Sequence, residues 1–450
     1  MSALIQLNPG RYPFLLQSVS AGSQQSCFDI LFAFPGETLC LTAEGLCGPS
    51  AEKAGGSFLT ALDHWWLSEA SGSTDGDDPD SDLPFTGGWF LYLGYELAAE
   101  VEPGLQLTKP DDVPVAFATR VPVAIINDRV NDQTIIIAEP EAAKSIASVR
   151  EDINASVVAP ELPTVSNLVD EIVEDPPEDF LAAVKRAKQS IRAGDIFQAN
   201  LSRRWQAQLN EKVAPVELYR RLCETNPAPF AGMIVMDNYA VISSSPERLV
   251  KRFGRRIDTR PIAGTRPRTE APGMVDVSCE ELLGNPKERA EHIMLIDLER
   301  NDLGRVCVGG SVEVDEYMVV ESYSHVHHIV SNVTGMARSD LTPGELIRAV
   351  FPGGTITGCP KVRCMEIIQE LEGRPRGAYT GSMGYLNRNG DCDLNILIRT
   401  MTLQGRHIEL AAGSGVVADS DPQTELNETR AKAKGMILAL SEQHDWEWNN

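Results

Sequence analysis

The sequence lacks the features of a membrane, secreted or zinc-binding protein. Its nine cysteines include no CxxC pair, and an odd number of scattered thiols predicts reduced cysteines in a cytoplasm. No apolar run approaches the roughly 20 residues that cross a bilayer, and the start, MSALIQLNPGRYPF, has no basic segment before an apolar core. We therefore expect a cytoplasmic protein without a signal peptide, a membrane span or a zinc site.

Positive charge is also scarce. The chain carries 40 Lys and Arg against 64 Asp and Glu, a net charge of −24, and such a surface repels nucleic acid and anionic lipid. The hydrophobic content of 42% is that of an ordinary globular protein. The 450 residues suffice for two or three domains or one large α+β body. We expect a globular protein that binds neither nucleic acid nor membrane.

A stretch rich in proline and acidic residues divides the sequence. Residues 159–178 contain four prolines, which is typical of a boundary or crossover. Before it lie mostly strands and turns, and CFDILFAF and TLCLTA flank a Pro-Gly pair that predicts a hairpin. After it helices and strands alternate, and EYMVVESYSHVHHIVSNVTGMA predicts one long strand. We predict an N-terminal region, 1–158, and a C-terminal region, 178–445, in one intertwined body.

Near the end of the chain, a loop of small residues precedes an acidic helix. The loop AAGSG, 411–415, lets a ligand approach the backbone because nothing larger than Ser protrudes. Asp421 with the proline after it predicts a helix start, and Glu425, Glu428 and Lys432 then share one face. Taken alone, this face favours a solvated helix with a Glu428–Lys432 ion pair. If the two carboxylates hold a metal ion, the same helix face and the small-residue loop beside it would suit a small anionic substrate.

A second acidic pair changes that balance. Glu288 and Glu291, in KERAEH, are again three residues apart on a predicted helix, whose apolar residues, Ile293 among them, predict its buried side. Two such helices facing each other would gather four carboxylates, which repel one another unless a cation lies between them. Carboxylate oxygens are the ligands that Mg²⁺ prefers. We therefore expect Mg²⁺ at Glu288, Glu291, Glu425 and Glu428.

Several single residues have both a structural and a chemical interpretation. Glu247, in SSSPERL, is either a turn residue paired with the adjacent Arg or, in an apolar pocket, a general acid. The segment RPIAGTRPR, 260–268, is either a solvated turn or a carboxylate clamp in which Thr265 donates a hydrogen bond. Arg399 stands in the apolar run LNILIRTM, where a buried guanidinium needs an anion. His325 alone predicts a structural histidine.

Together these motifs resemble those of one family. From about Glu178 onward the chain resembles the chorismate-utilising enzymes, which include anthranilate synthase component I, aminodeoxychorismate synthase component I and the isochorismate and salicylate synthases. The motifs stand in the family's order: GDIFQANLS, SSSPERL, RPIAGTRPR, KERAEHIMLIDLERND, SHVHHIVS, FPGGTITGCPK, RGAYTGSMGY, IRT, AGSGVVADSDP and ELNETRAKA. The resemblance implies an α+β fold in which two large antiparallel sheets pack as a sandwich with helices outside.

The resemblance also implies roles for residues of this chain. Glu247 would be the general acid that helps the C4 hydroxyl of chorismate leave, and Mg²⁺ would hold the ring carboxylate. Tyr379 and Arg399 would bind the enolpyruvyl carboxylate. Gln198 stands where isochorismate and salicylate synthases carry a water-activating Lys, and Gln cannot act as a base. His325 and Thr265 would complete the catalytic set, and the substrate site would also include Ala263, Gly264, Thr355, Gly413, Ser414, Gly415 and Lys432.

Two features bear on the choice between the amine-transferring members. Many aminodeoxychorismate synthases carry a nucleophilic Lys in PIKGT; here Ala263 stands instead, the form common in anthranilate synthase, so ammonia would attack directly or water would be the C2 nucleophile. The first half favours aminodeoxychorismate synthase, because Gln17 replaces the Glu of the LLES segment that helps form the tryptophan site of anthranilate synthase. The segment NPAPFAG, 226–232, also resembles that subfamily. Tryptophan stays a candidate ligand of the N-terminal region.

Three hypotheses follow. The first is an aminodeoxychorismate synthase large subunit, which aminates chorismate at C4 to give 4-amino-4-deoxychorismate for 4-aminobenzoate and folate synthesis. The second is anthranilate synthase component I, which aminates at C2 and eliminates pyruvate. The third is a non-catalytic amino-acid sensor, although a sensor would not need both carboxylate pairs. We find no Gly-x-Cys-x-Gly glutaminase segment, so ammonia would come from a separate glutamine amidotransferase subunit or from solution.

Overall fold

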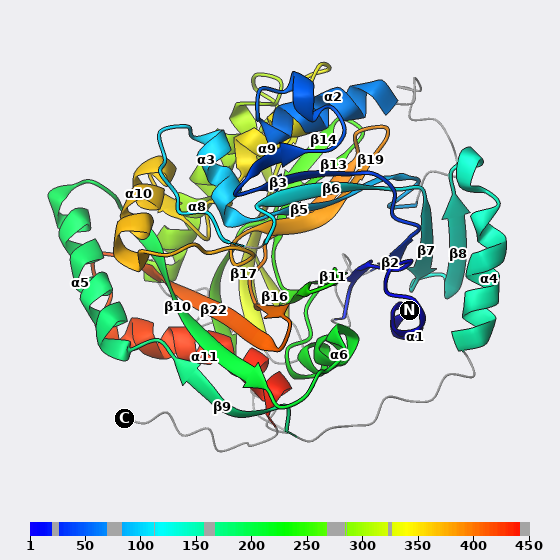
Figure 1. The fold of residues 1–450 in the computed structure, drawn as a ribbon. Coiled ribbons are helices and arrows are strands. Elements are labelled where there is room, and N and C mark those ends of the chain that lie inside the picture. The colour runs from blue at the N-terminus through cyan, green and yellow to red at the C-terminus, as the bar shows by residue number, and fades with distance from the viewer. Residues whose placement is uncertain are drawn as a thin grey trace, which may run out of the picture.

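Two antiparallel sheets pack face to face at the centre of the molecule, with helices on the outer side of each (Figure 1). This computed structural model describes residues 1–19, 27–69, 83–111, 113–156, 167–267, 284, 286–322 and 326–441. The arrangement confirms the predicted α+β sandwich.

The first sheet contains eleven described strands. They are β1 (Phe14–Gln17), β2 (Phe28–Ala33), β7 (Val123–Asp128), β8 (Gln133–Ala138), β9 (Val169–Glu174), β10 (Gln198–Leu209), β11 (Phe230–Val235), β12 (Tyr239–Ser245), β18 (Gly358–Cys359), β21 (Thr400–Gln404) and β22 (His407–Val416). Their order is β18-β10-β22-β21-β12-β11-β1-β2-β7-β8, and β9 pairs with β10. The predicted glycine loop is therefore the end of β22, next to β10.

The second sheet also contains eleven described strands. They are β3 (Thr38–Thr42), β4 (Gly45–Cys47), β5 (Gly88–Leu93), β6 (Ala116–Val121), β13 (Arg248–Phe253), β14 (Arg256–Thr259), β15 (Ile262–Pro267), β16 (Glu313–Ser322), β17 (Val326–Met336), β19 (Ser382–Asn387) and β20 (Cys392–Asn395). Their order is β15-β17-β14-β13-β20-β19-β5-β6-β3-β4, and β16 pairs with β17. The three-residue β4 ends the sheet.

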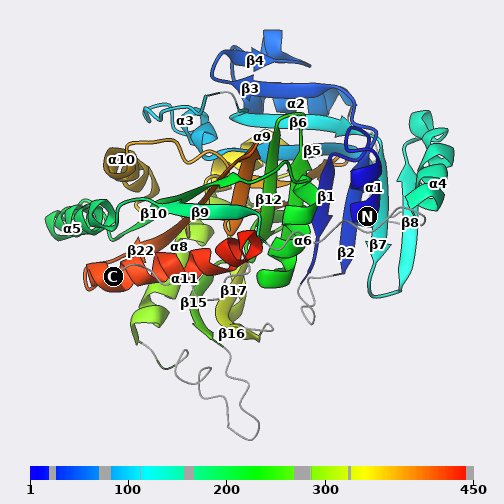
Figure 2. The same cartoon turned by 60° about the horizontal axis from the view of Figure 1, so that its bottom comes forward.

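Helices cover both outer faces. They are α1 (Ser2–Leu7), α2 (Phe58–Glu69), α3 (Ala98–Val101), α4 (Ser145–Ser156), α5 (Pro177–Ala193), α6 (Pro215–Thr225), α8 (Pro286–Gly304), α9 (Pro343–Val350), α10 (Lys361–Glu372) and α11 (Pro422–Leu440), with short 3₁₀ turns η1 (Ala51–Lys53), η2 (Tyr95–Leu97) and η3 (Pro140–Ala142). Figure 2 shows α11 and α6 lying together over the first sheet, against β22 and β12. No helix in the described part of the chain is long and apolar enough to cross a membrane.

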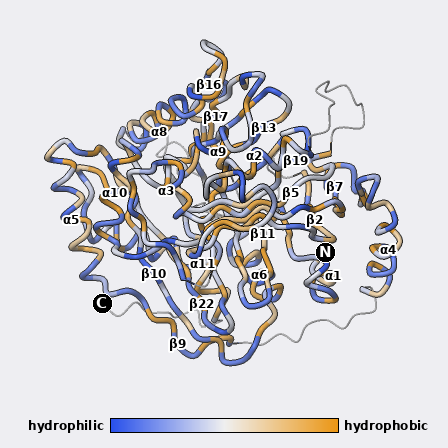
Figure 3. Tube along the Cα trace, turned by 45° about the horizontal axis from the view of Figure 1, so that its top comes forward, coloured by the Kyte–Doolittle hydropathy of each residue, from blue (hydrophilic) through white to orange (hydrophobic). Residues whose placement is uncertain are grey.

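Aromatic side chains fill the space between the sheets. Phe14 of the first sheet stacks on Phe90 of the second with ring centroids 4.2 Å apart, and Phe32 meets Phe90 edge-on. Separate apolar cores lie beneath α6 and α11 and beneath α2 and α9. In Figure 3 the strands through the centre are largely hydrophobic, whereas hydrophobic and hydrophilic residues alternate along the peripheral helices. The three cores explain why strands of both sheets are buried on both faces.

Both halves of the sequence contribute to both sheets. β1 of the N-terminal region pairs with β11 of the C-terminal region, with Gln17 opposite Ala231. In the second sheet, β5 pairs with β19 in the same way. Each region therefore supplies backbone partners to the other.

Three local predictions are wrong. β2 and β3 are not a hairpin, because the chain crosses from one sheet to the other between them. The long predicted strand is two strands, β16 and β17, paired antiparallel. In α8 the prediction is wrong only for Ile293, which is 49% exposed, because Ile296 and Leu303 of the same predicted side are buried, together with His292 and Leu295. The alternation of apolar and polar residues indicates which face of a sheet a side chain lies on, but it does not indicate which strand pairs with which.

Candidate active site

β22 and α11 form one wall of the candidate site. Asp421 caps α11 by accepting a hydrogen bond from the Thr424 N–H at 2.9 Å, as predicted. The Lys432 ammonium pairs with Glu428 at 2.7 Å and donates to the Gly413 carbonyl at 2.9 Å. The predicted ion pair is therefore confirmed, and it holds the ammonium against the glycine strand.

The two glycines of β22 leave room for neighbouring side chains. A Cβ on Gly413 would lie 2.6 Å from the Tyr379 hydroxyl, and one on Gly415 would lie 2.5 Å from the Gln198 amide nitrogen. Ser414 lies between them, so its side chain points to the opposite face of β22. The side chain of Tyr379 therefore lies against the backbone of Gly413, and that of Gln198 against the backbone of Gly415. We call this face of Gly413 and Gly415 the glycine slot.

Glu247 lies buried between β12 and β13. Burial raises the pKa of its carboxyl to about 7, although the Thr355 hydroxyl, the Ile262 N–H and the charge of Lys432 all act to lower it. Arg248 does not neutralise it, because that guanidinium pairs with Asp393 at 2.8 Å. Arg248 is not among the groups that shift the pKa of Glu247, so the turn ion pair that the sequence allowed is wrong, and about half of the carboxyl groups carry a proton near pH 7.

Tyr379 and Arg399 precede strands rather than lying within them. Tyr379 stands in the turn before β19, and Arg399 directly before β21 with a φ of 52°. The Arg399 side chain is partly exposed, yet burial lowers the pKa of its guanidinium to about 10. It donates to the Lys432 carbonyl and lies near Tyr379 and Glu428. A positive φ at a non-glycine residue is strained and frequent at functional sites.

Several buried polar atoms surround the glycine slot and Glu247 without a well-formed hydrogen bond among the described residues, although Thr355 lies close to Glu247 and Asn200 close to Tyr379. They are Gln198 Oε1, Asn200 Nδ2, Glu247 Oε1 and Thr355 Oγ1. Buried polar atoms nearly always have a partner, so this group predicts a polar ligand or bound water. We did not anticipate Asn200, although its place in GDIFQANLS, two residues after Gln198, puts it on the same face of the strand.

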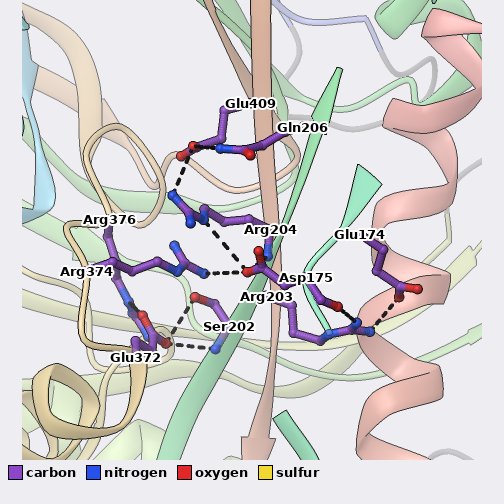
Figure 4. A network of polar contacts seen from close by, with 10 residues as sticks. All are labelled: Glu174, Asp175, Ser202, Arg203, Arg204, Gln206, Glu372, Arg374, Arg376 and Glu409. Carbon is purple, nitrogen blue, oxygen red and sulfur yellow. Dashed lines mark hydrogen bonds and ion pairs between the residues drawn. The ribbon is translucent and has the colours of Figure 1, made fainter. Parts of the chain in front are cut away.

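A network of ion pairs and hydrogen bonds contacts β10 (Figure 4), and the side chains of its Arg376 and Glu372 are buried. Arg376 pairs with Glu372 at 2.7 Å and donates to the carbonyls of Asn200, at 2.7 Å, and Ile356, at 3.1 Å. It therefore ties the strand that carries Gln198 to the segment that carries Thr355. Glu372 is the last residue of α10 and Arg376 lies four residues beyond it, outside the helix, so no helical spacing in the sequence marks this pair.

The predicted metal ligands lie on two helices. Glu288 and Glu291 are partly exposed on α8, Glu425 is buried on α11, and Glu428 is held by Lys432. Among the residues that the structure describes, no three Asp, Glu, His or Cys side chains come close enough to hold a metal ion. The hard oxygen atoms of the four carboxylates still suit Mg²⁺ in chemistry, and the metal site stays a prediction.

A second buried acid lies further along α8. Glu299 is 11 residues after Glu288 and so returns to the same helix face. Burial, the nearby charge of Asp302 and that of Glu247 raise the pKa of Glu299 to about 8. Asp302 pairs with Lys361 at 2.5 Å. The sequence did not identify this cluster, because a Glu in a helix is usually exposed.

The structure describes the remaining predicted residues only in part. His325 lies outside the described residues, and the side chains of Ala263 and Thr265 do too. Their segment is not a turn but strand β15, with a register shift around Gly264, whose φ is 71°. The Ile262 N–H beside Glu247 places this strand next to the candidate acid.

A separate pocket of about 430 Å³ lies where β1 meets β11. Its lining includes Gln17, Ser18, Pro229, Phe230 and Asn395. The two segments whose sequences favoured aminodeoxychorismate synthase, around Gln17 in β1 and Phe230 in β11, thus line one cavity.

Comparison with known proteins gives the family. Residues 45–438 match the family described as chorismate binding enzyme, and the chain belongs to that family. It is 46% identical to an anthranilate synthase component I-like protein of Synechocystis over 80% of this chain and 73% of that protein. It is 40% identical to aminodeoxychorismate synthase component 1 of Bacillus subtilis over 84% and 81%. The names of these relatives divide between anthranilate synthase and aminodeoxychorismate synthase.

Solved structures agree on the fold. Anthranilate synthase component I from Streptococcus pneumoniae superposes with a TM-score of 0.78 at 30% identity, covering 92% of this chain and 93% of that one. The menaquinone-specific isochorismate synthase MenF of Escherichia coli superposes with a TM-score of 0.72 at 15% identity, covering 98% and 91%. The second likeness concerns the fold alone.

Proposed function

We propose that the chain is the large subunit of an aminodeoxychorismate synthase, which converts chorismate and ammonia to 4-amino-4-deoxychorismate for 4-aminobenzoate and folate synthesis. The observation that supports chorismate chemistry is Glu247, a buried carboxyl with a pKa of about 7 beside the glycine slot, and Gln17 with the NPAPFAG segment favours the aminodeoxychorismate product over anthranilate. A general acid with a pKa near the working pH suits the departure of a poor leaving group such as hydroxide. Gln198 at the slot argues for ammonia over activated water, because an amide cannot act as a base.

Each residue around the glycine slot has a separate role in the proposed reaction. Glu247 donates its proton to the C4 hydroxyl, so that the C–O bond breaks and water leaves, while a C–N bond forms and ammonia loses a proton. Lys432 and Arg399 supply positive charge for the two carboxylates of chorismate. Tyr379 and Thr355 offer hydroxyl groups for orientation. His325 and Thr265 stay candidate catalytic residues on the evidence of their motifs.

Mg²⁺ is the proposed cofactor. Glu288, Glu291, Glu425 and Glu428 would hold it, and the bound ion would neutralise the ring carboxylate of the substrate. The proposed partner is a glutamine amidotransferase subunit that supplies ammonia.

Anthranilate synthase component I is the second candidate. Several observations favour it: the Ala at position 263, a 41% identity to anthranilate synthase component 1 of Synechocystis over 79% of this chain, and the anthranilate synthase names of two of the proteins compared above. Against it stands the pocket at Gln17, where an amide replaces the carboxylate expected of a tryptophan-inhibited enzyme. The pocket is large enough for a small ligand, and tryptophan is the first ligand to test there, because its binding would favour this second candidate.

A coupled assay separates the candidates. The purified chain is incubated with chorismate, Mg²⁺ and an ammonium salt, with and without added aminodeoxychorismate lyase. We expect 4-aminobenzoate and pyruvate only when the lyase is present. Fluorescent anthranilate and pyruvate from this chain alone would assign it to the second candidate. No turnover with ammonium or with a glutaminase subunit would favour a non-catalytic sensor.

A further inference from the structure

Two cysteines face each other in the hairpin at the free edge of the second sheet. β3 and β4 pair antiparallel, and Cys40 lies directly opposite Cys47. Directly opposite residues point to the same face of a sheet, with Cα atoms about 4.5 to 5.5 Å apart. Disulfides span Cα separations of about 4.4 to 6.8 Å. The backbone therefore already holds this pair within bonding reach.

The two thiols differ in accessibility. Cys47 is exposed and Cys40 is partly buried, and both are free thiols. Burial, together with the adjacent Cys47 thiol, raises the pKa of Cys40 to about 11. An external oxidant therefore meets Cys47 first. Among the described strands, no other two cysteines stand opposite each other in register, and Cys364 is buried with its thiol donating to the Gln198 carbonyl at 3.0 Å.

We propose that Cys40 and Cys47 form a reversible disulfide, a redox modification site separate from the chorismate site. The oxidant is a low-molecular-weight disulfide such as oxidised glutathione. The Cys47 thiolate attacks it, which forms a mixed disulfide and releases one thiolate. Cys40 loses its proton to solvent, attacks the Cys47 sulfur and releases the second thiolate. The protein is oxidised by two electrons, and the external disulfide is reduced by two.

The Cys40–Cys47 disulfide would stabilise β4, the strand at the edge of the second sheet. β4 has three residues and pairs only with β3 among the described strands. Gly48 follows directly, and its backbone lies so close to β3 that a Cβ there would stand 2.2 Å from the Thr38 carbonyl oxygen. Oxidation should therefore slow amide hydrogen exchange in the β3–β4 hairpin without moving the sheet.

Peptide mapping tests the proposal on the full chain. The protein is equilibrated in glutathione buffers of increasing oxidised fraction, quenched in acid, alkylated and cleaved after glutamate. Cleavage at Glu44, between the two strands, puts Cys40 and Cys47 in separate peptides. We expect these peptides to become cross-linked and to lose alkylation together, and dithiothreitol to restore both. Hydrogen exchange of the hairpin should slow in the oxidised form only.

Three variants sharpen the result. Cys40→Ser should stop at a mixed disulfide on Cys47, and Cys47→Ser should prevent reaction of Cys40. Cys223→Ser, which removes a partly buried cysteine on α6, should leave the cross-link unchanged. Cross-linking should also speed up as pH rises, because Cys40 must ionise. A Cys40 that stays alkylated while Cys47 is glutathionylated, or a link from either residue to another cysteine, would overturn the proposal.

Discussion

At the scale of single residues, burial gives the candidate site its chemistry. Glu247 sits in a motif that the sequence identified, but its pKa of about 7 depends on neighbours from distant segments. Thr355, Ile262 and Lys432 all lie near it. The residue type and its motif were therefore predictable. The proton on Glu247 was not, because desolvation depends on packing that no local pattern contains.

Replacing Glu247 by Gln tests the general acid. The variant keeps the shape of the side chain but has no proton to donate, so kcat should fall by about 10²- to 10⁴-fold while KM changes little. Steady-state kinetics with ammonium measures both, and circular dichroism checks the fold. A kcat within threefold of the parent protein would remove Glu247 from the mechanism.

The pH dependence of kcat follows from the same group. Glu247 donates only in its protonated form, whose population falls as pH rises through about 7. We expect kcat to decline above that pH, measured at a constant concentration of free ammonia. A kcat that stays level from pH 6 to 9, or rises, would contradict the assignment.

Glu299 provides a prediction about stability. Its pKa is about 8 in the folded protein and 4.5 in an unfolded chain. The folded protein binds the Glu299 proton more tightly than the unfolded chain does. The stability that this difference contributes is therefore complete below pH 4.5 and is lost as pH rises towards 8. Glu299→Gln should lessen the drop in urea midpoint between pH 5 and 8, whereas Glu313→Gln, at an exposed site, should not. Equal drops in both variants would show that Glu299 ionises normally.

At the scale of elements, local signals predicted what lies within one segment. The Asp421 cap and the start of α11 are confirmed. The prediction that β2 and β3 form a hairpin is wrong, because a Pro-Gly turn between apolar runs looks the same whether the chain returns or crosses to another sheet. The cluster of Glu299, Asp302 and Lys361 escaped prediction for a similar reason, since Lys361 lies on another helix.

The glycine slot gives a prediction for β22. Gly413→Ala would place a Cβ 2.6 Å from the Tyr379 hydroxyl and 2.7 Å from the Leu201 carbonyl oxygen. One of these groups must shift, and a misplacement of about 1 Å can cost about 10²-fold in rate. We expect a loss of that order in kcat/KM. Gly104→Ala, where a Cβ meets nothing within 4 Å, is the control. Equal activity of the two variants would mean that the slot does not position the substrate.

At the scale of the whole molecule, the two sheets depend on both halves of the chain. β1 and β2 lie between β11 and β7 in the first sheet, and β5 joins β19 to β6 in the second. The sequence indicated one intertwined body, and the resemblance implied a sandwich. The pairing of particular strands came only from the structure, because register between distant segments leaves no local pattern.

Truncation tests this dependence. A chain of residues 178–450 would expose the unpaired edges of β11 and β19 and the apolar core between the sheets. We expect it to aggregate or to lack a cooperative unfolding transition in calorimetry, and coexpression with residues 1–177, which contain β9, to restore a soluble complex. A stable, cooperatively folding 178–450 fragment would show that the regions are independent domains.

The position of the new C–N bond tests the central claim most directly. The purified chain is incubated with chorismate, Mg²⁺ and ¹⁵N-ammonium, and the product is examined by carbon-detected NMR. The account predicts a ¹⁵N–¹³C coupling at C4 of a product that retains its enolpyruvyl group. A coupling at C2 of an aromatic ring, with pyruvate released, would contradict it and assign the chain to anthranilate synthesis.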